Sequence, residues 1–233
     1  MVGSIFLAMT AAELSGAVLP DKAAYMACHF SPYGRGLSNV PDSLPQGSML
    51  ILNDRIPISG HDPSLVAEQL EQAVEQLACG CMLLDFQRTG NEETRQVCRQ
   101  VTKSLPCPVG ISEAYAEDLD GAVFLPPLPP CRTLQDHIDT WQGREIWLET
   151  APERWQITVT EAGSQTQPLP YCLPPSDAFT DEKLHCHYHQ TVLADRVEFF
   201  LYRTTEDIQE LLQEGHSLGI TTAIGLWQQF RST

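Results

Sequence analysis

The segment Gly80-Cys-Met-Leu-Leu-Asp-Phe-Gln87 is almost continuously apolar until it ends in polar residues. A short run of this kind is typical of a strand that is covered on both faces, as in a parallel sheet. Seven other runs of four to eight residues have the same character. The predicted strands are Ser4–Met9, Ala24–Phe30, Met49–Leu52, Cys81–Phe86, Pro108–Ser112, Ala122–Leu125, Glu145–Leu148 and Ile220–Trp227.

Segments with helical periodicity lie between several of these strands. They are Ser64–Ala78, Asn91–Leu105, Thr133–Trp141 and Thr204–Leu218. Strands that alternate with helices form right-handed βα units, and eight such strands predict an α/β fold, a small closed (β/α)₈ TIM barrel. An open doubly wound parallel sheet is the alternative, because Ser31–Gly47 and Glu113–Asp120 contain no obvious helix.

The segment Ala151–Arg203 departs from this alternation. Trp155–Glu161 alternates between apolar and polar residues, and His185–Leu193 and Val197–Tyr202 also have the composition of strands. Four prolines lie in Gln167–Pro175. We therefore predict one TIM-barrel domain over 1–233 that carries a small antiparallel β insertion, 151–203, between its seventh and eighth strands.

Composition limits the classes of function. The chain has 233 residues, and its 14 Lys and Arg against 30 Asp and Glu give a net charge of −16. This charge argues against nucleic-acid partners and against anionic membrane surfaces. No apolar stretch approaches the ~18 residues of a membrane-spanning helix. The eight cysteines form no dense disulfide framework and the start of the chain has no basic leader, so we expect a cytoplasmic protein. No cofactor is expected, and the oligomeric state stays open.

Polar residues gather where the predicted strands end. In a TIM barrel these ends converge on one mouth, where active sites lie. Paired carboxyl groups at such a mouth suit glycoside hydrolysis, in which one of the two stays protonated to serve the leaving oxygen. The residues at strand ends are His29, Asp54, Asp85, Gln87, Glu113, Glu149 and Trp227.

The fourth predicted strand resembles the signature strand of glycoside hydrolase family 18, the chitinase-like TIM barrels. That signature is D-G-x-D-x-D-x-E, and Asp85 matches its third aspartate, which the resemblance implies would orient the acetamido group of the substrate. Gln87 stands where the family has its catalytic glutamate. Leu83 replaces the middle aspartate, and Gly80 replaces the first. The resemblance therefore implies a barrel of this lineage with a degenerate catalytic motif.

The end of the chain carries a second resemblance. Tyr202–Ile208 followed by Gly219–Trp227 is similar to the last βα unit of the family, in which the final strand ends in a tryptophan that floors the sugar site. The resemblance implies this role for Trp227. The sixth strand, Ala122–Leu125, lacks the M-x-Y-D ending of the family.

Three hypotheses of function follow. The first is a barrel that lacks ordinary chitinase activity and binds a glycan, an amino sugar or a related polar ligand at its mouth. The ligand-binding residues would be Asp85, Gln87, Glu149 and Trp227. The second is an active glycoside hydrolase in which Glu113 or Glu149 supplies the proton. The third is a non-catalytic structural or regulatory partner protein whose mouth is closed by proline-rich loops such as Pro126–Pro130.

A histidine cluster could instead bind a metal. His185, His187 and His189 alternate along a predicted strand and would share one face. Three imidazoles are enough for a zinc site, but neighbours on one face of a strand lie about 7 Å apart. A solvent-facing stripe over Cys186 and Tyr188 is the alternative, and we predict no metal.

Overall fold

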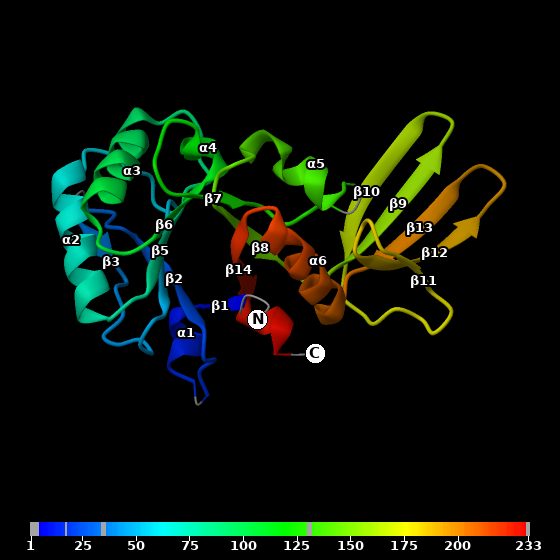
Figure 1. Ribbon diagram of the computed structural model, residues 1–233, viewed down its shortest axis with the longest axis horizontal. Coiled ribbons are helices and arrows are strands. Elements are labelled where there is room, and N and C mark those ends of the chain that lie inside the picture. Colours follow the sequence, from blue (N-terminus) through cyan, green and yellow to red (C-terminus); the bar gives the residue numbers. More distant parts are fainter. Residues whose placement is uncertain (1–4, 17, 34–35, 130–131, 232–233) are drawn as a thin grey trace.

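The computed structural model describes residues 5–16, 18–33, 36–129 and 132–231. Its larger sheet follows the order β1-β14-β8-β7-β6-β5-β4-β2-β3, and β1 also pairs with β2. The pairing of β1 with β2 closes eight parallel strands into a barrel (Figure 1). These strands are β1 (Ile5–Met9), β2 (Ala23–Phe30), β4 (Met49–Asn53), β5 (Cys81–Asp85), β6 (Val109–Ser112), β7 (Ala122–Leu125), β8 (Ile146–Thr150) and β14 (Ile220–Leu226). The predicted TIM barrel is confirmed, and the open sheet is excluded.

Apolar side chains fill the inside of the barrel. They include Phe6, Met49, Leu83, Phe124 and Trp147, all at most 9% exposed. The indole ring of Trp147 lies so close to Gly110 that a Cβ atom at that position would overlap it. A glycine on β6 thus provides the space for the largest interior side chain.

Helices cover the outside of the barrel, and capping side chains fix where they begin. The longer ones are α2 (Pro63–Gln76), α3 (Glu92–Ser104) and α6 (Thr205–Ser217). Asp62 accepts a hydrogen bond from the Ser64 amide at the start of α2, and Asn91 caps α3 in the same way. The predicted helix over Thr133–Trp141 is a short α-helix, α5 (Leu134–Ile138), followed by the 3₁₀-helix η1 (Asp139–Trp141).

The two connections without a predicted long helix contain only short elements. Residues 31–47 hold the two-residue strand β3 (Leu37–Ser38), which runs antiparallel to β2. Residues 113–120 hold one turn of helix, α4 (Glu113–Ala116). Two further short helices, α1 (Ala11–Leu14) and α7 (Trp227–Phe230), follow β1 and β14. Among the described residues, no helix is long and apolar enough to cross a membrane.

A five-stranded antiparallel sheet lies between β8 and β14 in the chain, in the order β10-β9-β13-β12-β11. Figure 1 shows it to one side of the barrel, beyond α5 and α6. Its strands are β9 (Arg154–Thr160), β10 (Gly163–Leu169), β11 (Phe179–Asp181), β12 (Cys186–Val192) and β13 (Val197–Tyr202). Sequence analysis did not predict β10, which contains Pro168; this strand lies at an edge of the sheet, where proline is tolerated.

Arg203 joins this sheet to the barrel. Its guanidinium group is buried and donates hydrogen bonds to the carbonyl oxygens of Leu128, Leu184 and His185 at 2.8, 3.1 and 3.3 Å. It also lies 5.0 Å from the ring centre of Trp155 on β9. One buried cation therefore holds a barrel loop, the approach to β12 and the start of β9 together.

Candidate functional site

A cavity of about 580 Å³ lies at the carboxyl ends of the barrel strands. This volume is within the range of ~300–1,000 Å³ that ligand pockets occupy. Apolar side chains from the barrel interior, such as Leu83 and Phe124, form part of its wall. The polar residues that line it are Thr10, His29, Asn39, Asn53, Asp54, Arg55, Asp85, Gln87 and Glu149. We call this space the central cavity.

Asp85 and Gln87 meet in the central cavity at the end of β5. The Gln87 side-chain amide donates a hydrogen bond to Asp85 Oδ1 at 2.5 Å. Burial raises the pKa of the Asp85 carboxyl group, the Gln87 amide opposes this rise, and the negative charge of Asp54 adds to it. Ser112 on β6 donates a longer hydrogen bond of 3.5 Å to the same oxygen. Asp85 is therefore oriented by two neutral donors, and no Lys or Arg in the described part of the chain forms an ion pair with it.

Asp54 follows β4 and is buried, with 7% of its surface exposed. Its Oδ2 atom accepts a hydrogen bond of 2.7 Å from the backbone amide of Arg88. The hydroxyl group of Tyr115 donates to the carbonyl oxygen of the same arginine. Asp54 thus holds the loop after β5, which carries Gln87, and it also lines the central cavity.

Glu149 lines the same cavity from β8. Burial raises its pKa to about 7, and the negative charges of Asp85 and Glu153 contribute to the rise. A carboxyl group with this pKa is partly protonated at neutral pH, so it can donate as well as accept a hydrogen bond. Glu149 and Asp85, two of the three carboxyl groups that line the cavity, are therefore in different electrostatic environments.

His29 lines the cavity from β2, and its ring is fixed by the backbone. The Nδ1 atom lies 2.7 Å from the Phe30 carbonyl oxygen, so Nδ1 carries the hydrogen and donates it. In the neutral ring, Nε2 is then an acceptor. The side-chain amide of the neighbouring Asn53 donates a hydrogen bond of 2.8 Å to the carbonyl oxygen of Met26. Its side-chain oxygen accepts a hydrogen bond from the backbone amide of Arg55.

Two of the predicted site residues do not line the central cavity. Glu113 is the first residue of α4, and it is exposed. Trp227 is the first residue of α7, and it lines a different hollow with Ala12, Glu13 and Arg231. Gly225 and Leu226 line the cavity at the end of β14 instead. The structure thus brings together five of the seven residues at strand ends: His29, Asp54, Asp85, Gln87 and Glu149.

Several residues that line the central cavity were not predicted from the sequence. Thr10 and Asn53 also stand at strand ends, after β1 and in the last position of β4, so the rule that identified Asp54 would have found them. Arg55 lies one residue further along the loop and is the one Lys or Arg among the described cavity residues. No sequence signal distinguished it from other surface arginines.

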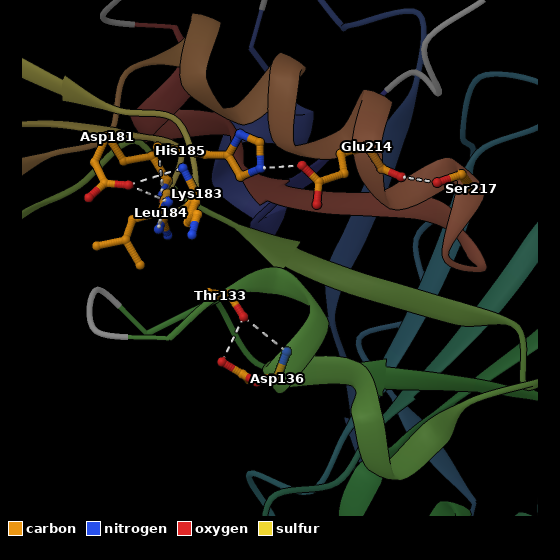
Figure 2. A network of polar contacts seen from close by, with 9 residues as sticks. Thr133, Asp136, Asp181, Lys183, Leu184, His185, Glu214 and Ser217 are labelled. Atoms are coloured by element: carbon orange, nitrogen blue, oxygen red, sulfur yellow. Dashed lines mark hydrogen bonds and ion pairs between the residues drawn. The ribbon is translucent and has the colours of Figure 1, made fainter.

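The three histidines of the insertion contact separate partners. The side chain of His185 points toward α6, where Nε2 lies 3.0 Å from the Glu214 carboxylate (Figure 2). His187 Nδ1 lies 3.1 Å from Asp207 Oδ2, and His189 stacks on Phe200 at 4.8 Å between ring centres. Within the described ranges, no three His, Cys, Asp or Glu side chains are arranged to hold a metal ion. The hypothesis of a three-histidine metal site is therefore wrong for this arrangement.

The alternative prediction, that the three histidines form a solvent-facing stripe, is also wrong. His185 is 7% exposed, and its φ of 48° breaks the extended alternation before β12 begins. His185 and His187 pair with acidic residues of α6, so they help to attach the inserted sheet to the barrel. Their role in the structure is in packing and hydrogen bonding.

The mouth of the barrel is open. The central cavity reaches Leu226 and Thr10 at the ends of the strands. The described part of the proline-rich segment, Pro126–Pro129, does not line it, and Pro130 is outside the described residues. Closure of the mouth by this segment is therefore not observed for the described part of the chain.

No family model and no curated protein sequence matches this chain. Several solved structures, including the following three, are similar to it in fold. The spore cortex-lytic enzyme SleL of Bacillus cereus is 11% identical with a TM-score of 0.52, and the match covers 91% of this chain and 66% of that one. SleL of Bacillus megaterium QM B1551 is 9% identical with a TM-score of 0.54, and the match covers 97% of this chain and 70% of that one.

The third is ydhD of Bacillus subtilis, assigned as a sporulation-specific glycosylase. It is 9% identical with a TM-score of 0.51, and the match covers 86% of this chain and 90% of that one. This chain shares the barrel fold of these three proteins. It spans just under two thirds of the length of the Bacillus cereus enzyme. At identities of 9–11%, the likeness establishes the fold and leaves the chemistry to the residues of the cavity.

Proposed function

We propose that this protein binds a glycan or an amino sugar in the central cavity and lacks ordinary chitinase activity. The observation that carries the proposal is the hydrogen bond from the Gln87 amide to Asp85 Oδ1. In the strand motif that resembles glycoside hydrolase family 18, Asp85 stands at the third aspartate and Gln87 at the final glutamate. The fold of three glycosylase-like and cortex-lytic proteins supports the same assignment.

The position of Gln87 explains why ordinary hydrolysis is not expected. Cleavage of a glycosidic bond needs a carboxylic acid that protonates the leaving oxygen. An amide cannot supply this proton, although it can donate a hydrogen bond to a sugar oxygen. General acid catalysis contributes roughly 10²–10⁴-fold to the rate. A protein that depended on Gln87 for this step would therefore lose that factor.

The lining of the cavity suits a neutral, hydroxyl-rich ligand. Asp54, Asp85 and the Nε2 atom of His29 offer acceptors, whereas the Gln87 amide and a protonated Glu149 offer donors. Hydroxyl groups can match both kinds of partner. The net charge of −16 and the acidic lining oppose a polyanionic ligand.

Binding can be tested by thermal shift and calorimetry with a panel of amino sugars and muropeptide fragments. A ligand that binds only the folded state raises the melting temperature by mass action. We expect at least one panel member to do so, and Asp85→Asn to weaken that binding. Glu113→Gln is the matched control, because this acid also follows a strand but lies outside the cavity. A panel without any binder, or equal effects of the two variants, would contradict the proposal.

Activity is tested with a chromogenic N-acetylglucosaminide. We expect no hydrolysis above the background of the same preparation of Gln87→Ala. Robust hydrolysis that disappears in Gln87→Ala would show that this position supports catalysis, and the proposal would then be wrong.

Glu149 favours a second candidate function, an active glycoside hydrolase with a recruited acid. Its pKa of about 7 lets it hold a proton at neutral pH inside the cavity, where Asp85 can act as the second carboxyl group. Hydrolysis of any glycan should then increase as the pH falls through 7 and should be lost in Glu149→Gln. A rate that does not depend on Glu149 would exclude this candidate.

A further inference from the structure

A second cavity of about 300 Å³ lies between the inserted sheet and the end of the barrel. Its wall includes Pro152 and Glu153 after β8, the ends of β9 and β10, and α7. It shares no described lining residue with the central cavity. We call it the side cavity.

Three side chains of the side cavity carry buried polar atoms that have no hydrogen-bond partner among the described residues. These atoms are Arg154 Nε, Tyr171 Oη and Gln229 Oε1. In the described ranges only six buried side-chain atoms lack a partner, and half of them belong to this one wall. Burial of a polar atom without a partner is unfavourable, and such atoms in proteins usually bond to something that is not protein. Three such atoms around one cavity indicate that a ligand binds there.

The Arg154 side chain is held in place by contacts that do not use Nε. Its Nη1 atom donates to Cys172 Sγ at 3.1 Å. The guanidinium carbon lies 5.3 Å from the ring centre of Phe200 and 5.1 Å from that of Tyr202. No carboxylate of the described residues lies within salt-bridge distance of Arg154. The Nε–H donor is therefore positioned in advance of any ligand.

The three atoms demand different hydrogen-bond partners. Arg154 Nε is a donor, Gln229 Oε1 is an acceptor and the Tyr171 hydroxyl can be either. Hydroxyl groups can satisfy all three. An anion would suit Arg154 but not Gln229, and acidic groups of Glu153 and Glu206 lie near this wall. Apolar contacts come from Pro152, Pro168 and Leu169, which suit the carbon faces of a compact ligand.

We propose that the side cavity binds an uncharged, hydroxyl-rich ligand of the size of one sugar residue, through Arg154, Tyr171 and Gln229. The volume is at the small end of the ~300–1,000 Å³ of ligand pockets, in agreement with a single ring. The site is independent of the central cavity and does not require the central cavity to bind a glycan.

The site is tested by titrating the protein with glucose and with N-acetylglucosamine while the side-chain amide signals of Gln229 are followed by NMR. We expect one of the two sugars to shift these signals in a saturable manner. Tyr171→Phe should weaken this binding about two- to tenfold, the loss expected for one neutral hydrogen bond. Tyr188→Phe is the matched control on the opposite face of the inserted sheet, and it should leave the affinity unchanged.

A double variant separates this proposal from the one for the central cavity. In Asp85→Asn with Glu149→Gln, the response of Gln229 should persist at the same sugar concentration. The proposal is overturned if neither sugar shifts the signals, if Tyr171→Phe binds as tightly as the parent, or if the response vanishes in the double variant. It is also overturned if a high-resolution crystal soaked with both sugars shows only water at the three atoms. If Tyr171→Phe does not fold, the sugar affinity of Gln229→Met is compared with that of the parent by calorimetry, and it should be weaker in the same way.

Discussion

Glu149 and Asp85 come from different strands of the barrel and line one cavity, and their ionisation is coupled. Burial raises the pKa of Glu149 to about 7, and the negative charge of Asp85 is the second cause of the rise. The pKa of Asp85 is also raised, chiefly by burial. One carboxyl group is therefore partly protonated at neutral pH beside another that the Gln87 amide helps to keep ionised.

Removal of the Asp85 charge should lower the pKa of Glu149. In Asp85→Asn the cost of burying the Glu149 carboxylate remains, but the repulsion from a neighbouring negative charge disappears. The Glu149 pKa should therefore move toward its ordinary value without reaching it. Carbon-detected NMR titration of the Glu149 carboxyl group provides the measurement. Glu113→Gln should leave that pKa unchanged, and an equal shift in both variants would refute the coupling.

The free energy of unfolding should depend on pH through Glu149. The folded state retains a proton that the unfolded state releases between about pH 4.5 and 7, so this group lowers stability as the pH rises across that window. Replacement by a neutral isostere removes the effect. Glu149→Gln should be more stable than the parent at pH 8 by roughly 1–3 kcal/mol, after allowance for partial exposure.

Urea unfolding of the parent and Glu149→Gln at pH 5 and at pH 8 measures this difference. The gap between the two proteins should be clearly smaller at pH 5. A gap that is the same at both pH values would show that the stabilisation comes from packing and that the Glu149 carboxyl group has an ordinary pKa.

Much of the barrel could be predicted because the signal is local. A buried parallel strand needs apolar residues at every position, so Met49–Asn53 and Cys81–Asp85 are visible as runs. Residues at the strand ends are then expected to lie at the mouth of the barrel, and Asp85 and Glu149 do line the central cavity there. β10 was missed because its residues are polar and it owes its extended form to pairing with β9.

The misplaced site residues share a physical cause, which is the direction of the chain immediately after a strand. At Glu113 the backbone turns directly into α4, and at Trp227 it turns directly into α7. A helix that begins at the strand end carries the side chain away from the strand axis. The positive φ of His185 likewise separates it from the alternation of His187 and His189. None of these turns has a sequence signal as clear as an apolar run.

Arg203 should be essential for attachment of the inserted sheet. Arg203→Met would remove the donor to three buried carbonyl oxygens and the contact with Trp155. Unpaired buried carbonyl groups are costly, so we expect a loss of roughly 3 kcal/mol or more in the free energy of unfolding. Tryptophan fluorescence in urea measures it, because Trp155 is buried beside Arg203.

Arg196→Met provides the control for Arg203. Arg196 lies in the turn between β12 and β13 of the same inserted sheet, and it pairs with Asp195 and Glu198 at the surface. Its replacement should change stability little, because exposed ion pairs contribute little. Similar losses in the two variants would mean that the sheet is held to the barrel by other contacts.

Gly110 should resist replacement because Trp147 occupies the space of its missing side chain. The Cβ atom of an alanine would overlap the indole ring, which is buried among the apolar side chains of the barrel interior. Overpacking of this kind typically costs ~1–3 kcal/mol. In a Trp147→Leu background the clash is relieved, so Gly110→Ala should then cost less by at least about 0.5 kcal/mol. A double-mutant cycle from urea unfolding measures this coupling, and strictly additive losses would show that Trp147 does not set the requirement for glycine.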